Sequence, residues 1–108
     1  MNSVILRIYM SQSDTYKGKS SHDVVVEYLK DAGIAGATVV HGIEGYGTHH
    51  EIHTANVLSL GVDLPVIVEV IDDEEKIRNV VPELRKMLPD ALMTLQDIEI
   101  VSNNKNLT

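Results

Sequence analysis

The strongest constraint on the fold of this chain is the order in which strand-like and helix-like segments follow one another. Residues 3–10 and 66–71 are runs of aliphatic and β-branched residues, which are typical of largely buried strands. Each run is followed by a segment with helical spacing, and weaker strand patterns lie at 37–40, 93–96 and 98–101. The resulting order is β-α-β-β-α-β. It predicts an α+β fold, a ferredoxin-like βαββαβ sandwich with one antiparallel sheet and two helices on one face.

Both predicted helices have an apolar face and recognisable ends. Ser20 or Ser21 is suited to cap the first helix, and Gly33 lies where a helix C-terminal glycine belongs. The acidic run 72–75 opens the second helix and offers a reciprocal capping pair, whereas Pro82 predicts a kink or a lost backbone bond. The apolar residues expected to face the sheet are Val24, Val25, Tyr28, Leu29, Ile77, Val80, Val81, Leu84, Met87 and Leu88.

Length and charge narrow the classes of function. The 108 residues fit a single domain, which we expect to span 1–102 with a polar tail over 103–108. Because so short a domain buries a modest share of its surface, we expect a homo-oligomer. The net charge is -7 and the nine basic residues are scattered, so direct nucleic-acid binding is not expected.

Cysteine chemistry and membrane insertion are also excluded by the sequence. The chain has no cysteine, and no apolar run reaches the roughly 18 residues that a transmembrane helix needs. The N-terminus lacks the pattern of a secretory signal, so we expect a cytoplasmic protein.

Three glycines, Gly42, Gly45 and Gly47, follow the second predicted strand within six residues. Glycine takes positive φ readily and permits close approach to a ligand, and free backbone N–H groups in such a segment can cradle a phosphate. A strand-end bulge followed by a flexible loop explains the same glycines without a ligand. The pattern alone leaves both interpretations open.

The run 35–47 together with 52–54 resembles a family of uncharacterised PII-like proteins, domain of unknown function 190, which is related to the PII nitrogen-regulatory signal transducers. Supporting signatures lie at 7–9, 63–66 and 72–77, so the resemblance covers nearly the whole chain. It implies a homotrimer that binds an adenine nucleotide between subunits. It also implies a long loop, here 48–62, that reports the nucleotide to a protein partner, with a membrane transporter or channel as one candidate.

The same resemblance implies which residues bind the nucleotide. His41 stands where relatives commonly carry arginine, which weakens one phosphate contact, and Tyr46 packs either on the adenine or on a neighbouring subunit. The connection 87–92 before the last strand contains no glycine and no lysine, so AMP or ADP is favoured over ATP with magnesium. The predicted nucleotide-binding residues are Thr38, His41, Gly42, Gly45, Tyr46 and Gly47.

A histidine cluster within the loop supports a second interpretation. His49, His50 and His53 flank Glu51, and imidazoles spaced in this way suit Zn, Ni or Cu. The alternative function is therefore a metal-responsive trimer, similar to the metal-tolerance proteins of the same architecture. A ligand-free protein adaptor with a solvated polar loop is the third possibility.

Motifs of catalysis are missing from the sequence. We find no nucleophile elbow, no Walker loop and no His-Glu-x-x-His pattern. The acidic run 72–75 is better explained by favourable interaction with a helix N-terminus. We therefore expect a protein that is not an enzyme.

Overall fold

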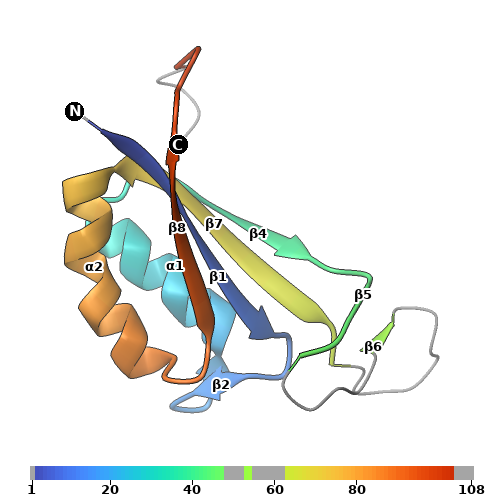
Figure 1. Cartoon of the computed structure of the whole chain (residues 1–108). Helices are drawn as coiled ribbons and strands as arrows, with labels where there is room; N and C mark the ends of the chain where they lie inside the picture. The colour runs from blue at the N-terminus through green and yellow to red at the C-terminus, as the bar shows by residue number, and fades with distance from the viewer. Residues whose placement is uncertain (1, 48–52, 55–62, 104–108) are drawn as a thin grey trace.

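A computed structural model describes residues 2–47, 53–54 and 63–103, with the backbone alone at 53–54. Four antiparallel strands form one sheet in the order β4-β7-β1-β8, and helices α1 and α2 lie together on one face of it (Figure 1). This arrangement confirms the predicted ferredoxin-like α+β fold. The main elements are β1 (Ser3–Ser11), α1 (Ser21–Asp31), β4 (Ala37–His41), β7 (Pro65–Asp73), α2 (Glu74–Met87) and β8 (Leu92–Ile98).

The sheet divides its side chains by the two-residue period of a strand. The register pairs Leu6 with Val70 and Ile8 with Val68, so that alternate residues of the two central strands point toward the helices. These residues are almost completely buried, and they form one core with Val25, Leu29, Ile77 and Leu84 of the helices. The apolar faces predicted for both helices are therefore confirmed.

Helix α1 begins and ends where predicted, but the hydrogen bonding at its start differs from the prediction. Gly33 has φ +83°, its N–H donates to the carbonyl of Lys30, and the next N–H, of Ile34, donates to Leu29, which together form a Schellman motif. At the other end Ser20 holds the N-cap position, yet its hydroxyl makes no capping hydrogen bond and is buried without a partner. The predicted N-cap position of Ser20 is therefore confirmed, whereas a capping hydrogen bond from its side chain is not formed.

Helix α2 starts at the end of β7 and is held there by Asn2. Asp73 is its N-cap residue without a side-chain capping bond, so the predicted reciprocal pair is wrong. Instead the Asn2 side-chain amide donates to Glu74 Oε1 and to Asp97 Oδ1, each at 2.9 Å. The hydrogen bonds from Asn2 and then Arg78 hold the pKa of Glu74 below its ordinary value of 4.5. The helix continues through exposed Pro82 to Met87.

Two short hairpins extend from the main sheet. Strands β2 (Thr15–Tyr16) and β3 (Lys19–Ser20) are joined by Lys17 and Gly18, both at positive φ as a tight type I′ turn requires. Strands β5 (Glu44–Gly45) and β6 (His53–Thr54) pair beyond the end of β4. Within the described residues neither helix is long and apolar enough to cross a membrane.

Candidate functional site

The predicted nucleotide-binding residues lie where β4 leaves the sheet. Thr38 is exposed on the face opposite the helices, where the register places it across from Glu69. His41 is the exposed last residue of β4 and lies across from Val66. Because neighbouring strand residues point to opposite faces, Thr38 and His41 lie on different sides of the sheet.

Gly42 is fixed against Pro65 at the start of β7. Its backbone N–H donates to the Pro65 carbonyl at 2.7 Å. A Cβ on Gly42 would lie 2.5 Å from Pro65 Cγ, and one on Gly45 would lie 3.1 Å from the same atom. Two of the three glycines therefore permit a close approach of the chain to a proline ring.

The expectation of positive φ in this segment was wrong. Among the described glycines, positive φ occurs at Gly18 and Gly33, whereas Gly42, Gly45 and Gly47 have ordinary backbone conformations. The physical reason for Gly42 is the space occupied by Pro65 rather than a left-handed turn. Gly47 has open space around its Cα, so a side chain would fit there.

The remaining predicted residues form the outer end of the segment. Gly45 pairs with His53 in the β5–β6 ladder, and Tyr46 follows with a side chain that is 68% exposed. His49 and His50 lie outside the described residues, and only the backbone of His53 is described. In the described part of the chain no three metal-ligating side chains gather, so the loop metal site stays a prediction.

Sequence reasoning missed the partner of His41. The ring of His22, in the first turn of α1, lies with its centroid 5.8 Å from that of His41 and its plane inclined by 80°. The two residues are far apart in sequence, and neither has a neighbour pattern that would have linked them.

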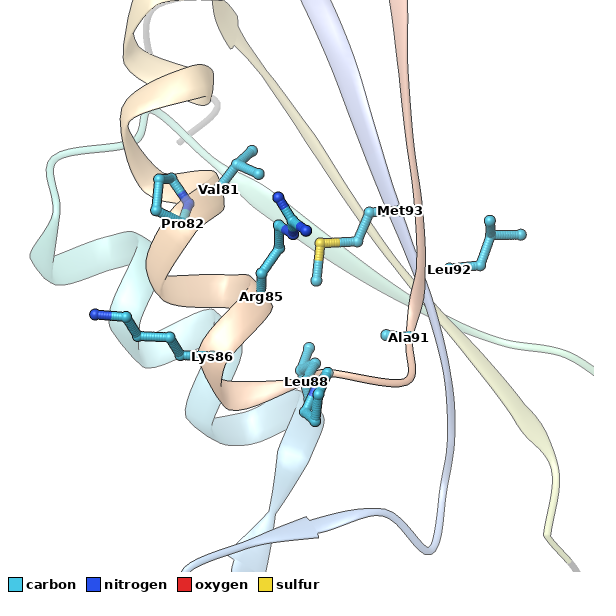
Figure 2. Close-up of a pocket in the computed structure, with 9 residues that line it drawn as sticks. Val81, Pro82, Arg85, Lys86, Leu88, Ala91, Leu92 and Met93 are labelled. Atoms are coloured by element: carbon cyan, nitrogen blue, oxygen red, sulfur yellow. The ribbon is translucent and has the colours of Figure 1, made fainter.

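A groove also opens at the opposite edge of the sheet, between α2 and β8. Its volume is about 650 Å³, within the range of small-molecule sites. Figure 2 shows Val81, Arg85 and Met93 pointing into the space between helix and strand, with Leu92 on the far side of β8 and Lys86 pointing away. Within the described residues the Arg85 guanidinium has no ion pair or hydrogen bond, so the groove contains one unneutralised cation.

Neither this groove nor a smaller pocket of about 370 Å³ beside the C-terminal end of α1 includes a predicted nucleotide-binding residue. Thr38, His41 and Tyr46 are all exposed in the single chain. The described residues therefore leave these three side chains open to solvent.

The face of the sheet opposite the helices carries an ion pair between Arg7 and Glu69, together with exposed apolar residues. The Arg7 Nε donates to Glu69 Oε2 at 3.0 Å, and Arg7 Nη1 donates to Gln96 Oε1 at 3.0 Å. Several large apolar residues surround this group and remain partly or largely exposed. They are Tyr9, Val40, Ile67, Ile71 and Leu92.

The amino-acid sequence matches the protein family DUF190, described as an uncharacterised ACR, over residues 3–100. A UPF0166 protein of Aquifex aeolicus is 39% identical over 97 residues, which cover 90% of this chain and 91% of that protein. A UPF0166 protein of Methanocaldococcus jannaschii is 36% identical over 97 residues, or 89% of each chain.

Solved structures share the fold at low sequence identity. CPII, a nitrogen regulatory PII-like protein from Thiomonas intermedia K12 solved with ADP, AMP and bicarbonate, matches with a TM-score of 0.71 and 16% identity, over 93% of this chain and 89% of that chain. The divalent ion tolerance protein CutA1 from Ehrlichia chaffeensis matches with a TM-score of 0.65 and 13% identity, over 98% of this chain and 89% of that chain. At such identities the likeness concerns the fold alone.

Proposed function

The chain belongs to the DUF190 family of uncharacterised PII-like proteins, and we propose that it is a nucleotide-binding regulatory protein that works as a homotrimer. The observation that carries the proposal is the segment from Gly42 to Gly47, held against Pro65 at the end of β4 in a PII-like fold. The solved PII-like protein CPII of this fold holds ADP and AMP, which supports an adenine nucleotide as the ligand.

We propose a role for each predicted residue, with Thr38 and His41 acting from opposite faces of β4. Gly42 and Gly45 keep the backbone close to Pro65, and exposed Gly47 leaves room beside Tyr46 for a ligand. Tyr46 offers an exposed aromatic face to the adenine, since aromatic rings stack on any base. Thr38 offers a hydroxyl on the face of β4 opposite the helices, and His41 offers an imidazole on the other face at the end of the strand.

The ligand is AMP or ADP in preference to ATP. In the described part of the chain the predicted segment contains no lysine or arginine, and His41 is its one basic side chain. A triphosphate needs more cationic charge than a single imidazole supplies, because burying several phosphate charges without partners is costly. A mono- or diphosphate fits this limited charge better.

The exposed face of the sheet supports the proposed trimer. The apolar residues around the Arg7–Glu69 pair are partly or largely exposed to water in the single chain. Burying this patch against other copies of the chain would stabilise a small domain. A neighbouring copy would also supply the missing wall of the cleft at Thr38 and Tyr46.

The loop 48–62 is proposed to report the nucleotide to a protein partner in the cytoplasm, without catalysis by the chain itself. A thermal-shift series with AMP, ADP and ATP tests the ligand, because a ligand that binds only the folded state raises its apparent stability. We expect a higher Tm with AMP and ADP than with ATP. An unchanged Tm with all three nucleotides would contradict the proposal.

A further inference from the structure

His22 and His41 meet where helix α1 begins and strand β4 ends. The side chain of His22 is 17% exposed, and its Nδ1 is buried without a hydrogen bond, as is the hydroxyl of Ser20 two residues earlier. Buried polar atoms in folded proteins almost always have partners, and an exception calls for an explanation such as an ion or a water. This end of α1 therefore holds the Ser20 hydroxyl without a hydrogen-bond partner, and a His22 Nδ1 whose neighbour is the Asp23 carboxylate at 3.2 Å.

The distance between the two rings suits a shared metal ion. Metal–nitrogen bonds of about 2.0–2.1 Å in a tetrahedral site place two imidazole centroids roughly 5 Å apart. The observed centroid separation is 5.8 Å. The observed separation exceeds this value by less than about 1 Å, and His41 lies at an exposed strand end where its ring can reorient.

Local charge favours a cation over an anion at this position. The N-terminal end of a helix by itself attracts anions. Here, however, Asp23 Oδ1 lies 3.2 Å from His22 Nδ1, and this exposed carboxylate would repel a phosphate and attract a metal ion. The first turn of α1 contains this acidic side chain and no lysine or arginine.

We propose that His22 and His41 bind one divalent transition-metal ion of the Zn²⁺, Cu²⁺ or Ni²⁺ type through one ring nitrogen each. These are the ions that imidazole ligands prefer. Among the described residues no group of three metal-ligating side chains gathers, so water completes the coordination and the ion exchanges readily. The bound metal would join α1 to the end of β4, directly before Gly42, and this proposal does not depend on nucleotide binding.

The test uses the variant His49→Ala/His50→Ala/His53→Ala, which leaves His22 and His41 as the remaining two of the five histidines. Titration with Cu²⁺ followed by electron paramagnetic resonance is expected to show one ion per chain with couplings from two imidazole nitrogens. Adding His22→Ala or His41→Gln should lower Cu²⁺ affinity roughly tenfold or more and leave one nitrogen coupling.

A second measurement avoids changing the nearly buried His22. Zn²⁺ added to the same triple variant should shift the ring-nitrogen NMR signals of His22 and His41 together, with unchanged circular dichroism. Absence of Cu²⁺ binding in the triple variant, or a copper signal unaffected by His41→Gln, would overturn the proposal. Ring-nitrogen shifts that inorganic phosphate causes and Zn²⁺ does not would also overturn the proposal. Since no readout includes a nucleotide, a failure here is distinct from a failure of the nucleotide proposal.

Discussion

Gly42 donates its backbone N–H to the carbonyl of Pro65 at 2.7 Å, and a Cβ at Gly42 would lie only 2.5 Å from Pro65 Cγ. This contact joins the residue that leaves β4 to the residue that opens β7. It determines the direction in which the segment to Gly47 departs from the sheet, and therefore where the proposed nucleotide site lies.

Replacing Gly42 by alanine should destabilise the fold. The added Cβ meets the rigid proline ring and the Pro65 carbonyl, so we expect a loss of about 1–3 kcal/mol in the free energy of unfolding, measured by urea denaturation. Gly47→Ala is the matched control, because its Cβ meets open space and should change stability by less than about 0.5 kcal/mol. Equal stability of both variants would contradict this explanation of Gly42.

Tyr46→Ala should weaken AMP binding roughly tenfold, because it removes an aromatic face for the adenine to stack on. Tyr46→Phe keeps the ring and should retain most of the affinity, as measured by titration calorimetry. If Tyr46 packs on a neighbouring subunit instead, Tyr46→Ala will lower the mass of the assembly measured by light scattering. Unchanged affinity and unchanged mass would exclude both roles.

Ile71→Asp should convert the proposed trimer into folded monomers. Ile71 lies on the exposed face of the sheet, and a carboxylate buried there between subunits would have no partner. Val101→Asp is the control, since Val101 is 87% exposed and follows the end of β8. Size-exclusion chromatography with light scattering separates the outcomes, and a trimer that survives Ile71→Asp would place the interface elsewhere.

Asn2→Ala should raise the pKa of Glu74 toward its ordinary value, because the hydrogen bond from Asn2 is the largest cause of the lowering. A lowered carboxyl pKa contributes stability above the ordinary value of 4.5, and that contribution is lost as pH falls through the folded-state pKa. The difference in unfolding free energy between the two proteins should therefore shrink in acid.

Carboxyl NMR titration measures the Glu74 pKa directly, and urea denaturation at several pH values measures the stability difference. Asn79→Ala, which removes an exposed asparagine from the same helix, is the control and should leave the Glu74 pKa unchanged. A Glu74 pKa that is insensitive to Asn2→Ala would contradict the assigned cause.

Local patterns in the sequence predicted the elements that depend on local physics. The apolar runs around Leu6 and Val68 identified the central strands, and Gly33 identified the end of α1, because strand alternation and helix termination are short-range properties. The positions of β1 and β7 in the sequence, and the apolar faces of both helices, could therefore be predicted from the sequence alone.

Contacts between distant residues were not predictable in this way. The serine and acidic caps were expected from sequence preference, but Asn2 holds the start of α2 through a contact across the fold. Likewise Gly42 needs to be glycine because of Pro65, and His22 reaches His41 because β4 ends beside α1. Such contacts depend on how the helices and strands pack together, and the local sequence preferences of each segment carry no information about that packing.

Titration calorimetry of the unmodified protein with AMP, ADP and ATP tests the central claim most directly. We expect AMP and ADP to bind with a Kd below about 1 mM and one site per chain, and ATP to bind more weakly. No heat of binding from any of the three nucleotides at millimolar concentration would contradict the proposed function.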